Sequence, residues 1–164
     1  MFILNKSESI EDNYATMVQS AKALLETETD LIAVLANVSA LVNVHVDELN
    51  WAGFYLLQGK ELVLGPFQGK PACIRIGEGK GVCGKAVLEG KPVNVPDVHQ
   101  FPDHIACDSG SKSELVIPFF KNGLVYGVLD LDSPLPNRFS DLEIDYLGKI
   151  AALLTAFLDA SQGS

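Results

Sequence analysis

The strongest constraint on the fold is a hairpin signal in the second half of the chain. Two apolar runs, Glu114–Phe120 and Leu124–Leu131, are separated by the turn sequence Lys121-Asn122-Gly123. Asn-Gly between two apolar runs is typical of a β-hairpin, because both residues tolerate the positive φ angles of a tight turn. The sequence therefore predicts two neighbouring antiparallel strands here, and so the fold must contain an antiparallel sheet.

Further strands are expected upstream of this hairpin. Residues Trp51–Leu57 are rich in aromatic and apolar side chains, and after a short turn Leu62–Pro66 is expected to form the return strand of another hairpin. Shorter strands are expected at 72–76 and 92–95, with a short helix, Val82–Glu89, between them.

Helical patterns flank this central region. Apolar residues recur at spacings of three and four in about residues 8–44, which are expected to form two helices, and again in a C-terminal helix at about residues 140–160. The last helix has the clearest start, since Ser140 and Glu143 fit a capping box.

Length and composition fit one domain. The chain has 164 residues, of which 48% are apolar and 20% are charged, so a substantial core can be buried. The sequence therefore predicts a single domain over residues 1–164. The sheet and the candidate site are expected at about residues 50–132 of this domain. Its class is α+β, with helices flanking a largely antiparallel sheet.

The charge balance and the apolar segments limit the partners. The chain has 12 basic and 21 acidic residues, a formal net charge of −9, which disfavours nucleic acid and anionic lipid as partners. The most apolar stretch, Ile150 to Leu158, is too short to span a bilayer. The N-terminus lacks the basic start and apolar segment of a signal peptide. We therefore expect a cytoplasmic protein that binds neither nucleic acid nor membrane.

Three cysteines, Cys73, Cys83 and Cys107, are the first candidates for chemistry. An odd number in a reducing compartment indicates reactive thiols, ligands or buried thiols rather than structural disulfides. Cys107 lies in a polar, turn-rich segment where a thiol can be accessible. Cys83 lies near a predicted helix start, where the helix dipole can lower its pKa. The alternative is that all three are small buried hydrophobic residues.

Zinc is a second possible role for these residues. Cysteine and histidine side chains that can act as ligands occur at five positions: Cys73, Cys83, His99, His104 and Cys107. Structural zinc sites usually present ligands in tight pairs, and His104-x-x-Cys107 is the closest pairing in this set. Because a second tight pair is missing, we expect no bound metal.

Three carboxylates are predicted to gather on one face of the main hairpin. Asp130 and Asp132 lie two residues apart in a strand pattern, so they point to the same face. Glu114 opens the preceding strand, across the turn. Mutual repulsion would raise the pKa of at least one of them, and such a group can act as an acid. The alternative is that this face of the sheet is simply exposed to solvent.

Trp51 and Tyr55 lie four residues apart in a predicted strand and therefore share a face. They can form the wall of an apolar pocket that accepts a soft sulfur or a cation. The alternative is ordinary core packing of two aromatic side chains.

These residues lie in motifs that resemble those of the free methionine-(R)-sulfoxide reductase family. The motifs are Asn50–Tyr55, Gly65–Cys73, Gly81–Gly84, His104–Asp108, Ser113-Glu114 and Gly127–Ser133. The resemblance covers nearly the whole chain and retains all three cysteines at the spacing of the family. It implies a single GAF domain, in which an antiparallel sheet flanked by helices encloses a small ligand on one face.

The resemblance also implies an activity. Members of this family reduce free L-methionine (R)-sulfoxide, rather than the peptide-bound form, to L-methionine. Their electrons come from thioredoxin and ultimately from NADPH, without a bound cofactor, and the members are commonly homodimers.

The resemblance assigns roles to the three cysteines. Cys107 is expected to be the nucleophile that becomes a sulfenic acid. Cys73 is expected to resolve it by forming an intramolecular disulfide. Cys83 is expected to be an auxiliary thiol that takes part in recycling.

The remaining site residues also take their roles from the resemblance. Glu114, Asp130 and Asp132 are expected to bind the substrate and assist its sulfoxide oxygen. Trp51 and Tyr55 are expected to surround the methyl-sulfoxide end. Two alternatives from other classes are a non-catalytic GAF sensor that binds a small ligand, such as a cyclic nucleotide, and a zinc-binding regulatory protein.

Overall fold

The computed structural model describes residues 9–104 and 110–161. The elements, in chain order, are α1 (Ile10–Glu26), α2 (Leu31–His45), β1 (Trp51–Gln58), β2 (Glu61–Gly69), β3 (Arg75–Ile76), α3 (Gly81–Glu89), β4 (Val93–Val95), the 3₁₀ helix η1 (Val98–Gln100), β5 (Ser113–Lys121), β6 (Leu124–Ser133) and α4 (Asp141–Ala160). None of the helices within these ranges is long and apolar enough to cross a membrane.

The strands form one antiparallel sheet in the order β3-β2-β1-β6-β5-β4. The central hairpin of β5 and β6 is closed by Asn122 and Gly123, whose φ angles are 53° and 80°. Because both angles are positive, the Asn-Gly pair forms the tight turn expected from the sequence, and the hairpin prediction is confirmed. The expected strand at 72–76 is shorter, since only Arg75 and Ile76 pair with β2.

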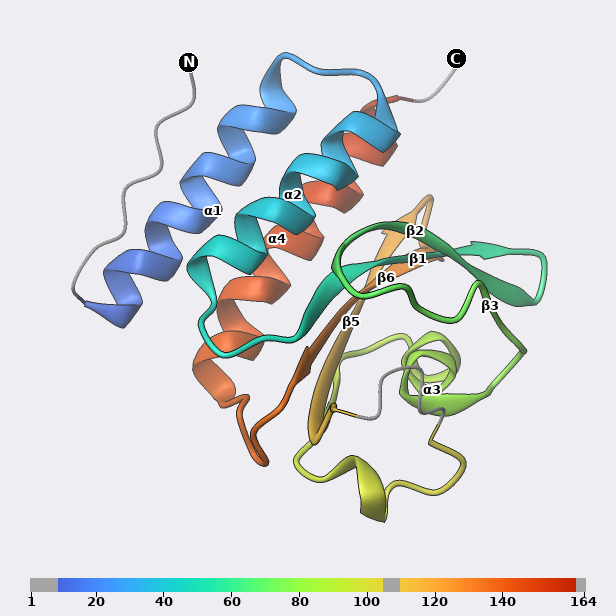
Figure 1. Cartoon of the computed structure of the whole chain (residues 1–164). Coiled ribbons are helices and arrows are strands. Elements are labelled where there is room, and N and C mark those ends of the chain that lie inside the picture. Colours follow the sequence, from blue (N-terminus) through green and yellow to red (C-terminus); the bar gives the residue numbers. More distant parts are fainter. Residues whose placement is uncertain (1–8, 105–109, 162–164) are drawn as a thin grey trace.

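The two faces of the sheet carry different layers (Figure 1). Helices α2 and α4 pack against one face, and α1 lies outside them, in contact with both. Helix α3 covers part of the opposite face and contacts β5 and β6. The predicted α+β arrangement of helices around an antiparallel sheet is therefore confirmed.

The alternation of side chains along the strands divides the interior into two clusters. Leu115, Ile117 and Phe119 of β5 face the long helices together with Leu129 and Leu131 of β6. These side chains are almost completely buried, and each such burial stabilises the fold by about 1.5–3 kcal/mol. Because successive residues of a strand point to opposite faces, the intervening residues point toward α3.

The start of α4 shows why the sequence located this helix well. The Ser140 side chain accepts from the Leu142 backbone N–H at 3.3 Å, and Glu143 Oε1 accepts from the Ser140 backbone N–H at 2.6 Å. This reciprocal arrangement is the capping box predicted from the sequence. Helix α4 therefore begins at Asp141, directly after the predicted N-cap.

Candidate active site

A cavity lies on the α3 face of the sheet, between that helix and strands β1, β5 and β6. The cavity is small, with a volume of about 40 Å³. Its walls include six of the eight residues selected from the sequence: Trp51, Tyr55, Cys83, Glu114, Asp130 and Asp132. Cys73 lies next to its rim, where Ala72 lines the cavity, and Cys107 lies outside the described residues.

Strand register brings the three carboxylates together. Glu114 of β5 is paired directly with Asp132 of β6, and Asp130 lies two residues before Asp132 on the same face. Only 7% of Glu114 and 5% of Asp130 is exposed, whereas Asp132 is half-buried. The alternative in which this face is exposed to solvent is therefore wrong, because α3 and the segments around it cover the face.

Burial changes the protonation of these acids. Loss of hydration raises the pKa of Glu114 to about 8, and the neighbouring charge of Asp132 acts in the same direction. Burial also raises the pKa of Asp130 well above its usual range, with the charge of Glu114 as the next cause. The cavity therefore contains at least one carboxyl group that is protonated at neutral pH and can donate a proton or a hydrogen bond.

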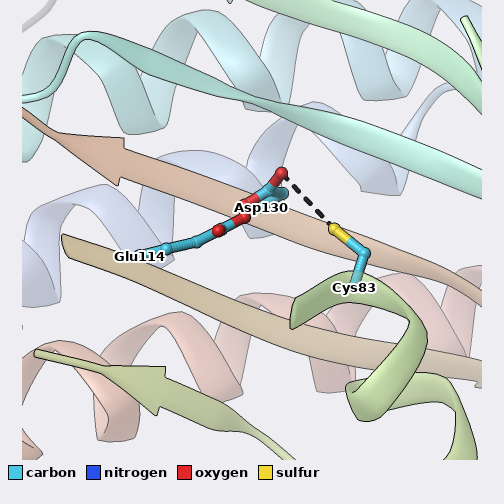
Figure 2. A group of neighbouring side chains, drawn as sticks. All are labelled: Cys83, Glu114 and Asp130. Atoms are coloured by element: carbon cyan, nitrogen blue, oxygen red, sulfur yellow. Dashed lines mark hydrogen bonds between the residues drawn. The ribbon is translucent and has the colours of Figure 1, made fainter. Parts of the chain in front are cut away.

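Cys83 belongs to the first turn of α3 and points at the carboxylates (Figure 2). Its Sγ lies 3.4 Å from Asp130 Oδ2, and the residue is a free, buried thiol. Burial, with the charges of Asp130 and Glu114 next in order, raises the pKa of Cys83 well above its usual value. The expectation that the helix start lowers this pKa is wrong, because these effects outweigh the partial positive charge of a short helix.

Cys73 lies in the segment between β2 and β3, next to the cavity-lining residue Ala72. The residue is half-buried, and it is disulfide-bonded in this structure. The Tyr55 hydroxyl donates a hydrogen bond of 2.8 Å to the Cys73 carbonyl oxygen. This bond ties the segment before β3 to the aromatic wall of strand β1.

The aromatic wall is a stack of three rings. The Trp51 ring lies 5.8 Å from that of Tyr55 and 5.2 Å from that of Phe67, with interplanar angles of 25° and 17°. The Trp51 indole N–H donates to the Lys70 carbonyl oxygen at 3.2 Å, which fixes the ring orientation. Trp51 and Tyr55 serve both roles weighed from the sequence, since they join a buried apolar cluster and also line the cavity.

Two further polar side chains line the cavity. His104 Nε2 lies 3.3 Å from Glu114 Oε1, and burial lowers the pKa of this histidine, which favours the neutral ring. Ser111 is 5% exposed, and its Oγ accepts a hydrogen bond of 3.0 Å from the Asn50 amide. The sequence indicated His104 only as a possible zinc ligand, and no motif indicated Ser111.

The arrangement supports three kinds of recognition. A protonated acid can donate to an oxygen atom, an ionised carboxylate can bind an ammonium group, and the aromatic stack can hold an apolar or sulfur-containing chain. The Cys83 thiol and the carboxylates of Glu114 and Asp130 also place three metal-ligand atoms within 4.8 Å of one another.

Comparison with known proteins gives related sequences over almost the whole chain. The GAF domain family model matches residues 9–158. The chain is 48% identical over 157 residues to Protein YtsP of Bacillus subtilis, covering 94% of this chain and 96% of that protein. It is 46% identical over 155 residues to free methionine-R-sulfoxide reductase of Escherichia coli, covering 94% of this chain and 92% of that protein.

A solved structure of a related protein has a similar fold over almost the whole chain. The X-ray structure of free methionine-R-sulfoxide reductase from Neisseria meningitidis, in complex with its substrate, has a TM-score of 0.94 and 42% identity, covering 99% of this chain and 98% of that one. These matches, with the cavity described above, agree with the family indicated by the sequence motifs. The chain belongs to the free methionine-R-sulfoxide reductase family, whose members are enzymes built on a GAF domain.

Proposed function

We propose that this chain reduces free L-methionine (R)-sulfoxide to L-methionine in the cavity beneath α3. The observation that carries the proposal is the pair of buried acids, Glu114 and Asp130, beside an aromatic wall and a cysteine-containing rim. Such a site offers a proton to a sulfoxide oxygen and an apolar surface to a methyl-sulfide group. The Neisseria meningitidis relative, solved with its substrate, supports the same choice of ligand.

The reaction begins at Cys107, which lies outside the described residues. Its thiolate attacks the sulfoxide sulfur while a protonated acid, Glu114 or Asp130, donates to the oxygen. Methionine leaves, and Cys107 becomes a sulfenic acid. The Cys73 thiol then attacks that sulfur, water leaves and a disulfide forms. A dithiol such as thioredoxin reduces the disulfide by exchange and becomes oxidised itself.

Preference for the free amino acid follows from the charges of the site. Asp132 is half-buried beside Glu114, and an ionised carboxylate there attracts the ammonium group of a free amino acid. A methionine sulfoxide within a peptide lacks this group. In the proposed cycle the enzyme acts as a cytoplasmic homodimer without a bound cofactor, and NADPH supplies the electrons through thioredoxin.

The test is an NADPH-coupled assay with thioredoxin and thioredoxin reductase. Free (R)-, free (S)- and peptide-bound methionine sulfoxide are compared as substrates, and we expect turnover of the free (R) form only. Cys107→Ser should abolish turnover. Glu114→Gln should lower kcat/KM by at least about 100-fold because the acid is lost. The matched exposed variant Glu89→Gln should behave like the wild type.

Two outcomes would reject the proposal. Wild-type turnover by Cys107→Ser would remove the assigned nucleophile. Absence of turnover of every sulfoxide, in a protein that binds another small ligand in this cavity, would favour the non-catalytic GAF sensor.

A further inference from the structure

The cluster beneath α3 has the composition and the spacing of a metal site. Cys83 Sγ, a carboxylate oxygen of Glu114 and one of Asp130 lie within 4.8 Å of one another, and all three residues are buried. They come from α3, β5 and β6 and converge on one point in Figure 2. Because each ligand belongs to a packed element, the cluster is largely preorganised. The tight-pair criterion applied to the sequence misses this set, because its members are far apart in the chain.

One distance within the cluster matches a tetrahedral zinc site. Zinc–sulfur bonds of about 2.3 Å and zinc–oxygen bonds of about 2.1 Å place the sulfur and oxygen ligand atoms about 3.6 Å apart. The observed Sγ to Oδ2 distance between Cys83 and Asp130 is 3.4 Å. The distance from His104 Nε2 to Glu114 Oε1 is 3.3 Å. His104 thus lies beside Glu114, but it is not among the residues whose ligand atoms all lie within 4.8 Å of one another.

An independent observation is an unsatisfied carboxylate oxygen. Asp130 is 95% buried, and its Oδ1 has no hydrogen-bond partner within the described parts of the chain. A buried polar atom without a partner costs free energy, so such atoms in native structures usually have an explanation. A cation held between the carboxylates would provide the missing partner for this oxygen.

The ligand types select the ion. A thiolate beside two carboxylates suits zinc, which accepts sulfur and oxygen ligands and can keep its fourth position open for water. Magnesium and calcium prefer all-oxygen ligands and are disfavoured by the Cys83 sulfur. The half-buried carboxylate of Asp132 beside Glu114 adds negative charge that attracts a divalent cation.

We infer that Cys83, Glu114 and Asp130 bind one zinc ion in the cavity as its three protein ligands. Because Glu114 and Asp130 are also the acids of the proposed reaction, a bound zinc ion would block the substrate site. Binding of the metal stands on the geometry alone, whereas inhibition by the metal rests on the proposed function. The two are therefore tested separately.

Binding is tested with cobalt(II) as a spectroscopic substitute for zinc. The protein used is the double variant Cys73→Ser/Cys107→Ser, in which Cys83 is the remaining thiol. We expect one cobalt ion per chain and a thiolate-to-cobalt charge-transfer band in the near ultraviolet, both reversed by zinc. Adding Cys83→Ser should abolish the band, and adding Asp130→Asn should weaken binding at least about tenfold, since even outer partners of a metal site contribute that much.

His99→Asn is the matched control, because His99 is exposed and lies outside the cavity. It should leave cobalt binding within about twofold of the double variant, as expected for a residue that is not a ligand. The proposal is overturned if the folded double variant gives no thiolate band, if the band survives Cys83→Ser, or if Asp130→Asn has no effect. Should the double variant not fold, as judged by circular dichroism, zinc calorimetry of Asp130→Asn against Glu89→Gln in the wild-type background decides the same question.

Inhibition is then tested in the coupled assay. Zinc should raise the KM for free methionine (R)-sulfoxide in the wild type, and a chelator should reverse the effect. Thioredoxin and its reductase are assayed with a different disulfide substrate at the same zinc concentration, so that their own inhibition is excluded. If the chain binds cobalt as described but reduces no sulfoxide, the metal site stands and the proposed function fails.

Discussion

Glu114 shows how a single position can change the chemistry of an ordinary side chain. Its place on β5, opposite Asp132 and beneath α3, removes it from water and raises its pKa to about 8. Glu89 of α3 is exposed instead, and its carboxylate lies 3.7 Å from the Lys85 ammonium rather than beside another acid. Burial and a neighbouring acid therefore give Glu114 a chemistry that the exposed glutamate does not share.

The raised pKa of Glu114 predicts how stability depends on pH. The folded protein keeps a proton that the unfolded chain releases above its usual pKa of 4.5, so the free energy of unfolding falls as the pH rises from there to about 8. The stabilisation is fully present below this window and lost above it. In Glu114→Gln this part of the fall in the free energy of unfolding should be absent. The expected difference from the wild type is about 4 kcal/mol between about pH 5 and about pH 9.

Urea denaturation of both proteins at these two pH values measures the difference. Glu89→Gln serves as the control and should follow the wild-type curve. If the free energy of unfolding of Glu114→Gln falls as much as that of the wild type between the two pH values, the raised pKa of Glu114 is contradicted.

At the scale of elements, the position of α3 depends on a close backbone approach. A Cβ atom placed on Gly84 would lie 2.5 Å from the carbonyl carbon of Gly79, a distance at which the backbone must shift. Gly84 follows Cys83 directly, and the thiol of Cys83 lies 3.4 Å from Asp130 Oδ2, so a displaced helix start is expected to move the thiol. The glycine therefore belongs to the geometry of the site, although it carries no reactive group.

We expect Gly84→Ala to push the start of α3 and the preceding loop at Gly79 apart. The free energy of unfolding should fall by about 1–3 kcal/mol, as for other overpacked sites, and kcat/KM should fall as Cys83 and the cavity wall move. Gly148→Ala is the matched control, because a Cβ on Gly148 of α4 has open space around it. It should raise stability by about 0.5–1 kcal/mol through helix propensity and leave activity unchanged.

Thermal denaturation and the coupled assay together check this pair of variants. Equal effects of the two alanine substitutions on stability and activity would show that the contact between α3 and Gly79 does not position the site.

At the scale of the whole molecule, a buried polar network joins the first and last helices. The Tyr14 hydroxyl of α1 donates to Glu143 Oε2 of α4 at 2.8 Å, across 129 residues of sequence. The Arg138 guanidinium lies 3.6 Å from the same carboxylate. Burial opposes ionisation of Glu143, but the hydrogen bonds from Ser140 and Tyr14 outweigh it and lower the pKa of the carboxyl group.

This network predicts a graded loss of stability. Tyr14→Phe should lower the free energy of unfolding by about 1 kcal/mol. Glu143→Ala should cost about 3 kcal/mol, since it removes the cap, leaves the Tyr14 hydroxyl without its acceptor and removes one of the charged partners of Arg138. Because the pKa of Glu143 is lowered, its contribution is present above the usual value of 4.5 and lost as the pH falls below it.

Chemical denaturation at neutral and acid pH checks this ranking. Tyr126→Phe is the control, because the Tyr126 hydroxyl makes no hydrogen bond in the described parts of the chain. It should have little effect. An equal cost for Tyr14→Phe and Tyr126→Phe would remove the assigned role of the Tyr14 hydroxyl.

Local patterns explain which predictions from the sequence are confirmed. The Asn122-Gly123 turn and the Ser140 cap depend on residues within a few positions of one another, so the chain encodes them without tertiary information. The side-chain alternation of β5 and β6 likewise placed Asp130 and Asp132 on one face. The expected strand at 72–76 was too long, because it depended on a partner strand that the local sequence does not specify.

The sequence by itself determined the α+β class, the central hairpin, the last helix and, through its motifs, the family. The assigned role of Cys107 stays a prediction, since this residue lies outside the described ranges. Tertiary structure alone decided that α3 covers the carboxylate face, that Cys83 is a protonated thiol against Asp130, and that His104 and Ser111 line the cavity. The physical reason is that turns and caps are local, whereas burial and charge coupling depend on which distant elements pack together.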